Sequence, residues 1–385
     1  MNERIKAIPP SATLRITSRA KAMVAEGRAV CNFAGGEPDF DTPEAVKQAA
    51  IRALEAGETK YTPVAGLPAL REAIARKLKA DNGLDYDASR IVVSNGGKHS
   101  LFNVMMALCG EGDEVLIPSP YWLSYPQMVR IAGGVPAFVE GDDAHGFKVT
   151  AEDVEAKITA RTKVLLINSP SNPCGIVYDR AELQALVDVA ERHGLYLVSD
   201  EIYEKLVYDG AEHVSPGSLS GRVFERTITC NGLSKAYSMT GWRLGYLAGP
   251  TDVVKAVIAL QGHSTSAPNT FAQYGAVEAL GMADAAIGEM VRAFDERRTY
   301  LFDRLNAMVG VQCVKPRGAF YMLPNIGALG MDSLTFAERL LESEAVAVVP
   351  GLPFGSDAHV RISYACSMDT IREGADRLER FIGSL

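Results

Sequence analysis

Short runs of apolar, mostly β-branched residues recur along the first two thirds of the chain. Most of these runs are nearly continuous, which is the pattern of strands covered on both faces of a sheet. Between several of them apolar residues return every three or four positions, as in 181–194, where Gly194 ends the predicted helix. This alternation predicts an α/β fold. The predicted strands are 90–94, 113–118, 135–140, 163–168, 195–200, 226–230 and 243–249.

The last part of the chain has a different pattern. After a long helical tract, shorter strands and helices begin near Val311, and they indicate a small α+β unit. We therefore predict a large domain over 41–290 and a small C-terminal domain over 291–385. The segment 1–40 could pack with either unit, and we assign it to the small domain.

Composition and charge narrow the class of protein. The 385 residues are 47% hydrophobic and 22% charged, as in ordinary globular proteins. A formal net charge of −8 gives no broad basic face, so neither nucleic acid nor an anionic membrane is an expected partner. The N-terminus is charged and broken by Pro9 and Pro10, and no apolar run approaches the ~18 residues of a membrane span, so we expect a cytoplasmic protein. Six dispersed cysteines without C-x-x-C spacing predict neither a disulfide framework nor a metal site.

Functional side chains follow several predicted strands, at the edge where open α/β sheets bind ligands. The segment SNGGKHSL places Gly96 and Gly97 at the start of a helix, where free backbone N–H groups can hold a phosphate. An ordinary tight turn is the stronger interpretation of this pair alone. Asp200 ends an apolar strand, where a carboxylate needs a cation or a strong donor, although it could also cap a helix. Tyr203 is by itself more typical of a core tyrosine.

Three further residues have both a binding and a structural interpretation. Trp122 could stack on an aromatic ligand or pack in the core. Asn172 could bond a ring oxygen or cap a turn, and the turn is favoured. Arg361 lies in an alternating apolar strand, where its guanidinium suits a carboxylate ligand or a structural ion pair.

Lys235 is a lone amine among small and apolar residues in NGLSKAYSMTGWRLG, with Arg243 eight positions later. A solvated surface lysine is the usual interpretation, but these neighbours fit it poorly. An amine here could lower its pKa and form a Schiff base. The turn at Gly96 and Gly97 can form a phosphate-binding cup, Asp200 supplies a carboxylate and Trp122 a stacking ring. Together with the Lys235 amine, these groups are what pyridoxal phosphate (PLP) requires as an electron sink.

The chain resembles the fold type I PLP enzymes, and within them the class I aminotransferases of the aspartate aminotransferase kind. GLSKAYSMTGWRLG is similar to their lysine signature, and GEPDFDTP, KYTPVAG, SPYW, NSPSNPCG, SDEIYE and VRISYA follow in the family's order. The resemblance covers nearly the whole chain. It implies a large domain whose mostly parallel sheet is sandwiched by helices, and a small α+β domain.

The resemblance also implies roles around the cofactor ring. Lys235 would hold PLP as an internal aldimine and then move the proton between the substrate Cα and the cofactor. Asp200 would pair with the pyridinium nitrogen, while Tyr203 and Asn172 would hydrogen-bond the phenolic oxygen. Trp122 would stack on the ring.

The phosphate site implied by the resemblance draws on two subunits. The backbone around Gly96, Gly97 and Lys98 would hold the phosphate, together with the Arg243 side chain. Tyr61 would reach the phosphate of the neighbouring subunit, which implies a homodimer with shared active sites.

The substrate site implied by the resemblance accepts an amino acid and a 2-oxo acid. Arg361 would clamp the α-carboxylate, and Gly36, Trp122 and Asn172 would line the same pocket. Lys98 would hold a distal carboxylate, with Thr13 nearby. Its amine could instead lie in solvent beside the phosphate cup. The first expectation is ping-pong transfer from L-aspartate to 2-oxoglutarate, giving oxaloacetate and L-glutamate.

Two departures from the family's pattern stand close to the site. The chain has Cys174 where relatives often have threonine, and burial as an inert thiol is the favoured interpretation over oxidation sensitivity. It has Gly232 where many relatives place a phosphate-binding serine, so one phosphate hydrogen bond would be lost or replaced.

Other functions remain open on the sequence. Prephenate, aromatic or broad aminotransferase specificity is one alternative, and a PLP-dependent lyase acting on a sulfur-containing amino acid is another. A regulatory protein would need a DNA-binding module, for which there is no room before Gly36. A non-catalytic α/β binding protein would show no visible imine absorbance.

Overall fold

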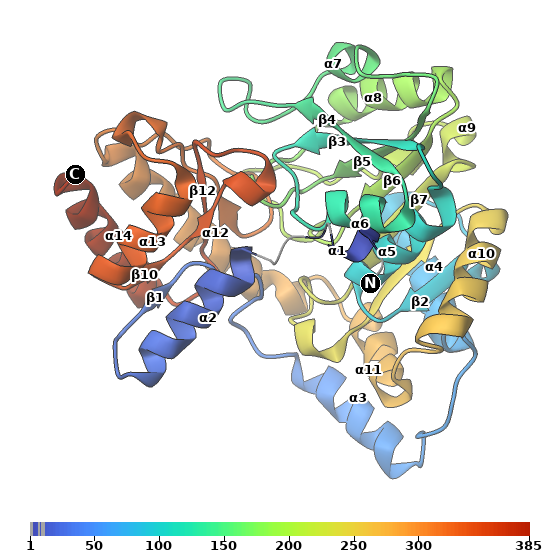
Figure 1. Ribbon diagram of the computed structural model, residues 1–385. Coiled ribbons are helices and arrows are strands. Elements are labelled where there is room, and N and C mark those ends of the chain that lie inside the picture. Colours follow the sequence, from blue (N-terminus) through green and yellow to red (C-terminus); the bar gives the residue numbers. More distant parts are fainter. Residues whose placement is uncertain (1–2, 7, 9–11) are drawn as a thin grey trace.

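A central sheet with helices on both faces forms the larger part of the molecule, and a smaller unit lies beside it (Figure 1). This is a computed structural model. It describes residues 3–6, 8 and 12–385, with side chains for 5, 6, 8 and from 15 onward. None of the helices in this described part combines the length and apolar character of a membrane span.

The described elements follow one another in a largely alternating order. The strands are β1 (Cys31–Asn32), β2 (Ile91–Ser94), β3 (Glu114–Ser119), β4 (Val135–Glu140), β5 (Thr162–Asn168), β6 (Tyr196–Asp200), β7 (Thr227–Gly232), β8 (Gly245–Ala248), β9 (Tyr321–Met322), β10 (Val346–Ala347), β11 (Val349–Pro350) and β12 (Val360–Ser363). The α-helices are α1 (Glu3–Lys6), α2 (Ala12–Ala25), α3 (Glu44–Glu55), α4 (Pro68–Asn82), α5 (Gly97–Leu108), α6 (Tyr125–Ala132), α7 (Ala151–Glu155), α8 (Arg180–Arg192), α9 (Gly221–Phe224), α10 (Thr251–Ser264), α11 (Thr270–Gly281), α12 (Ala285–Ala307), α13 (Ser333–Glu344) and α14 (Met368–Gly383). Short 3₁₀ turns lie at Ala88–Arg90, Pro216–Ser218, Thr240–Trp242, Gly327–Leu329 and Leu352–Phe354.

The large sheet has seven strands in the order β2-β8-β7-β6-β5-β3-β4. Its strands from β7 to β4 in that order pair in parallel, and β8 runs antiparallel to both β2 and β7. Each of the seven predicted strands therefore exists, and the predicted mostly parallel α/β sheet is confirmed. The parallel pairing brings the carboxyl ends of β3, β5, β6 and β7 to one edge of the sheet.

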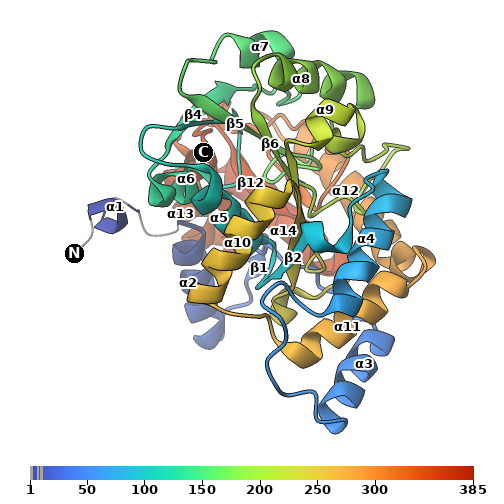
Figure 2. The ribbon, with the colours of Figure 1, turned by 90° about the vertical axis from the view of Figure 1, so that its right-hand side faces the viewer.

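Helices cover both faces of this sheet, which explains the continuous apolar runs. Val164 and Leu166 of β5 belong to the core that includes Leu101 of α5, on the face that α5, α6 and α10 cover (Figure 2). Leu165 and Ile167 belong to the core on the opposite face, which α8 covers. Because side chains alternate along a strand, a strand with two dry faces must be apolar throughout.

The smaller unit is built from the C-terminal part of the chain and an N-terminal segment. Its three-stranded antiparallel sheet has the order β11-β12-β9. Strand β1 pairs in parallel with β10, and α2 (blue) lies against the red and orange C-terminal elements (Figure 1). The proposed boundary at 290/291 falls within the continuous helix α12, and the exact domain limits stay a prediction.

Candidate active site

Residues from both units meet at the carboxyl edge of the large sheet. Asp200 ends β6, Lys235 follows β7, and Asn172 follows β5. Arg361 reaches the same place from β12 of the smaller unit and donates a hydrogen bond from Nη1 to Asn172 Oδ1 at 3.0 Å. The structure therefore brings together the central residues predicted from the sequence.

The Lys235 amine is half-buried at this edge. Its Nζ donates a hydrogen bond to Gly36 O at 2.5 Å and lies 5.9 and 5.8 Å from the ring centroids of Tyr203 and Phe320. Burial, with a smaller contribution from the positive charge of Arg361, lowers the pKa of Lys235 to about 8. A substantial fraction of the amine is therefore neutral near pH 7–8, as Schiff-base formation requires.

The Asp200 carboxylate is buried and forms no ion pair with the side chains that the structure describes. Oδ2 accepts a hydrogen bond from the Tyr125 hydroxyl at 2.6 Å, and Oδ1 accepts one from the Ile202 amide at 3.3 Å. Burial raises the pKa of Asp200 to about 6, although these hydrogen bonds act in the opposite direction. A protonated heterocyclic nitrogen placed here would supply the missing positive charge.

The Arg361 guanidinium is buried without a carboxylate partner in the described part of the chain. Besides Asn172, it bonds Ala34 O from Nη2 at 3.2 Å, and its Nε has no hydrogen-bond partner. Burial lowers the pKa of Arg361. A buried N–H donor without an acceptor lowers the stability of the folded protein, and a bound carboxylate would accept the hydrogen bond from Arg361 Nε.

A phosphate cup forms where β2 leads into α5. Gly96 caps this helix with φ 91°, and Gly97 is its first residue. The Arg243 guanidinium lies against Gly96, so a Cβ at position 96 would overlap it. A Cβ on Gly245 of β8 would likewise overlap the Gly97 amide. The free amides of a helix N-terminus and an adjacent arginine are suited to a phosphate dianion.

Lys98 and Trp122 stand together near the cup. Lys98 Nζ lies 4.9 Å from the centroid of the Trp122 ring, a cation–π distance. Burial, and to a lesser degree Arg243, lowers the pKa of Lys98 even though its side chain keeps exposed surface. The half-buried Trp122 also meets the Tyr125 ring edge-on at 5.2 Å.

Known proteins resemble this chain over its full length. The family model for "Aminotransferase class I and II" matches residues 28–378. The aspartate aminotransferase of Geobacillus stearothermophilus is 47% identical, over 99% of this chain and 98% of that protein. The aspartate/prephenate aminotransferase of Thermus thermophilus is also 47% identical, over 100% and 99%. The solved structure of Thermus thermophilus aspartate aminotransferase with maleate superposes with a TM-score of 0.95 at 47% identity, covering 99% of both chains.

The chain belongs to the class I and II aminotransferases. It is therefore a PLP-dependent enzyme of the fold type I architecture, and amino acids and 2-oxo acids are its substrates. The residues present fit this cofactor: a buried carboxylate without a cation, an amine of lowered pKa and a glycine-lined cup lie at one edge of the sheet.

Tyr61 and Thr13 are the remaining predicted site residues of this aminotransferase. The Tyr61 side chain is 94% exposed, as a residue that serves another subunit would be in a single chain. Thr13 falls in α2, but its side chain lies outside what the structure describes.

The structure bears on both departures from the family pattern. A Cβ on Gly232 would lie 3.0 Å from Gly245 Cα and from Leu244 O, so serine does not fit without a backbone shift. Cys174 is buried, and burial raises the pKa of its thiol. The expected inert thiol agrees with this environment.

Sequence reasoning missed several residues of this aminotransferase that contact the predicted ones. Tyr125 bonds Asp200, Gly245 makes room for the cup, and Tyr321 bonds Tyr203 and contacts Arg361. Tyr125 lies in PSPYWLSYP and Tyr321 in GAFYMLPN, both conspicuous segments. Nothing in their spacing indicated which residues of other elements they would meet.

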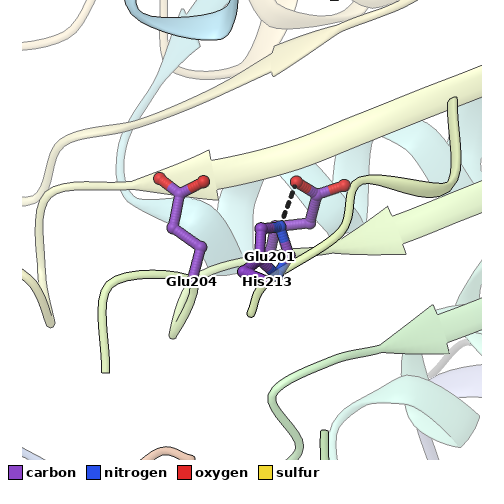
Figure 3. A group of neighbouring side chains, drawn as sticks. All are labelled: Glu201, Glu204 and His213. Atoms are coloured by element: carbon purple, nitrogen blue, oxygen red, sulfur yellow. Dashed lines mark hydrogen bonds and ion pairs between the residues drawn. The ribbon is translucent and has the colours of Figure 1, made fainter. Parts of the chain in front are cut away.

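A second polar cluster lies next to Asp200 and resembles a metal site in composition. Glu201, Glu204 and His213 offer ligand atoms within 4.8 Å of one another (Figure 3). Their carboxylate oxygens already accept hydrogen bonds from Lys77 Nζ, Asn82 Nδ2 and His213 Nε2. The Lys77 ammonium thus supplies the positive charge that a metal ion would bring, and the cluster is better described as a buried ion-pair network.

Proposed function

We propose that this aminotransferase transfers the amino group of L-aspartate to 2-oxoglutarate, giving oxaloacetate and L-glutamate by a ping-pong mechanism. The observation that carries the proposal is the presence of two cationic side chains, Arg361 and Lys98, among the candidate site residues. Arg361 is buried with an unpartnered Nε, and the Lys98 amine stands at the Trp122 ring. Two cations among the candidate site residues suit a substrate with two carboxylates.

The proposed roles divide the chemistry among this chain's own residues. PLP, when bound, supplies the electron sink for the charge that develops at the substrate Cα. Lys235 would hold the cofactor through its amine, take the proton from the substrate Cα and return it. Asp200 would keep the pyridine nitrogen protonated, and Tyr203 and Asn172 would hydrogen-bond the ring oxygen.

The remaining proposed contacts place the cofactor and the substrate. Trp122 would stack on the ring, and the cup at Gly96 and Gly97 with Arg243 would hold the phosphate. Gly36 would line the substrate pocket, because its carbonyl accepts the hydrogen bond from Lys235.

The names of relatives support aspartate and add a second substrate. Proteins 44–47% identical to this chain are named aspartate aminotransferase or aspartate/prephenate aminotransferase. Prephenate also carries two carboxylates, so the same two cations would accept it. Turnover of aspartate, prephenate and a panel of other amino donors and acceptors orders these substrates. Without an acceptor, a ping-pong aminotransferase releases at most one equivalent of 2-oxo acid per site, so continued release would instead indicate a lyase.

Borohydride reduction of the cofactor-loaded protein, followed by peptide mapping, tests the central assignment. We expect the label on Lys235 alone. Label on another lysine, or none, contradicts the proposal.

Kinetics of Lys98→Ala test the aspartate specificity. We expect kcat/KM for aspartate to fall about 10–100-fold and kcat/KM for a neutral amino acid to change little, because only aspartate has a distal carboxylate. Lys255→Ala, at an exposed position on α10, is the matched control. Equal losses on both donors would show that Lys98 does not recognise the distal carboxylate.

We further propose a homodimer in which Tyr61 completes the phosphate site of the other subunit. Its 94% exposure supports this role. Mixing inactive Lys235→Ala chains with weakened Tyr61→Ala chains would restore activity, because a mixed dimer holds one site with both native residues. No recovery on mixing would oppose shared sites. A cytoplasmic location also stays a proposal, supported by six cysteines that are free thiols.

A further inference from the structure

Tyr321 is the first residue of β9 and lies between two residues with proposed roles. Its hydroxyl is 3.0 Å from the Tyr203 hydroxyl, and its ring centroid is 4.4 Å from Cζ of Arg361. The side chain is 1% exposed. Tyr321 and Arg361 lie on neighbouring antiparallel strands, with Tyr321 opposite Ser363, so the two residues are diagonal neighbours.

The Tyr203 and Tyr321 hydroxyls form an isolated pair. In the described part of the chain neither hydroxyl has another hydrogen-bond partner. Each can donate one proton and accept others. If Tyr203 donates its proton to the cofactor oxygen, its lone pairs remain free to accept the Tyr321 proton. Consecutive hydrogen bonds polarise one another, so the second bond strengthens the first.

The Tyr321 ring has a different task from its hydroxyl. It lies against the guanidinium of Arg361, whose Cζ is also 5.1 Å from the centroid of the Phe354 ring. A buried cation–π contact is stronger than an exposed one because water no longer competes for the charge. The two rings therefore restrict how the guanidinium can turn, and its orphaned Nε stays available for a ligand.

We infer that Tyr321 is a positioning residue with two separable parts: its hydroxyl tunes the hydrogen bond that Tyr203 makes to the cofactor oxygen, and its ring holds Arg361 in place for the substrate α-carboxylate. The inference rests on the roles of Tyr203 and Arg361 in the proposed function. It assigns to Tyr321 no direct part in the proton transfer.

Two substitutions separate the parts. Tyr321→Phe removes the hydroxyl and keeps the ring, whereas Tyr321→Leu removes both, and Tyr321→Met is the second ring-deleting variant should the leucine protein not fold. The first readout is the pH midpoint at which the visible absorbance of the cofactor-loaded protein titrates. The second is the Kd of maleate, a dicarboxylate without an amine.

The expected results differ between the variants. A weaker hydrogen bond from Tyr203 leaves more electron density on the cofactor oxygen. That oxygen then holds more tightly the proton on the Lys235 nitrogen, through which the chain would hold the cofactor. The midpoint should therefore move to higher pH by about half a unit in Tyr321→Phe and in Tyr321→Leu alike. Maleate binding should stay within about twofold in Tyr321→Phe and weaken about tenfold in Tyr321→Leu.

Controls distinguish failure of this inference from failure of the proposed function. Tyr203→Phe should move the midpoint in the same direction and further, and Arg361→Lys should weaken maleate binding. Tyr86→Phe, which removes another buried tyrosine hydroxyl at the opposite end of β7, should change neither readout.

Specific outcomes overturn the inference. If both site controls respond but the Tyr321→Phe midpoint is unchanged, or Tyr321→Leu binds maleate as tightly as Tyr321→Phe, the inference is wrong and the proposed function stands. If Tyr203→Phe and Arg361→Lys do not respond, the proposed roles fail and the inference fails with them.

Discussion

Asp200 and Glu201 are adjacent carboxylates with opposite surroundings. Both are buried at the end of β6, and successive side chains at a strand end point in opposite directions. Asp200 faces the candidate active site and has a hydroxyl and an amide as partners but no cation. Glu201 faces the ion-pair network, where it accepts hydrogen bonds from Asn82, Ser199, Ser215 and His213.

The difference separates a binding site from a structural network. Buried charge is tolerated where the protein itself completes the partners, as Lys77 does for Glu204. At Asp200 and Arg361 the protein leaves partners missing, and a cofactor and a substrate carboxylate would supply them. Groups of the first kind should govern stability, and groups of the second kind should govern activity.

The largest expected effect is the difference in activity between substitutions of the two neighbouring carboxylates. We expect Asp200→Asn to lower kcat/KM about 10³-fold, because it removes the anion opposite the pyridine nitrogen. Glu201→Gln should lower it less than about tenfold, because within the described part of the chain the Glu201 side chain hydrogen-bonds to none of the proposed site residues. Steady-state kinetics with aspartate and 2-oxoglutarate measure both. Similar losses in the two variants would remove the distinction.

The second effect concerns the stability that Lys77 provides. Lys77→Met leaves the Glu204 carboxylate buried without its cation and should cost about 3 kcal/mol of unfolding free energy in urea. Lys79→Met, on the same helix α4, breaks an exposed ion pair with Asp85 and should cost less than about 1 kcal/mol.

The pH dependence of this loss follows from Glu204. Burial by itself would raise its pKa, but Lys77 and further partners lower the pKa of Glu204 from its ordinary 4.5 to about 2. The stabilisation is present above pH 4.5 and is lost as the pH falls toward 2. The difference between wild type and Lys77→Met should therefore shrink over that range, and a constant difference would argue against the ion pair.

The third effect concerns the stability of the cofactor-free protein, where the substitution that lowers activity, Asp200→Asn, should be stabilising. The folded-state pKa of Asp200 is about 6, above its ordinary 3.8, so the folded protein binds the proton more tightly than the unfolded chain. Stability therefore falls as the pH rises from about 4 to 6 and stays reduced above that range. Asp200→Asn should stabilise the cofactor-free protein by about 3 kcal/mol at pH 7 and have little effect at pH 4. Denaturant unfolding at both pH values measures this, and destabilisation at pH 7 would place Asp200 with the structural groups.

The smallest effect concerns His213, a member of the network with a buried nitrogen that has no hydrogen-bond partner in the described part of the chain. His213 Nδ1 is buried without a partner, although Nε2 lies 2.9 Å from Glu201 Oε2. His213→Gln can keep a donor to Glu201 without the orphaned nitrogen, so the unfolding free energy should change by less than about 1 kcal/mol. A loss of 2 kcal/mol or more would show that the His213 ring contributes more to stability than its hydrogen bond to Glu201.

The sequence by itself predicted the main elements of the fold and singled out the central candidate residues. The runs at 163–168 and 195–200 predicted β5 and β6 because strands with two dry faces must be apolar throughout. Lys235, Asp200 and the two glycines at 96 and 97 were identified because their residue types are unusual in those local settings. These are local signals, and each can be seen within a few residues.

Only the tertiary structure decided which residues meet. Tyr125 joins Asp200 from α6, Tyr321 joins Tyr203 and Arg361 from β9, and Gly245 makes room for the cup from β8. The sequence likewise did not show that the next acid along the chain, Glu201, has its hydrogen-bond partners in a separate network. Partners come from elements far apart in the chain, and whether a buried charge is satisfied or left open depends on those partners rather than on the residue itself.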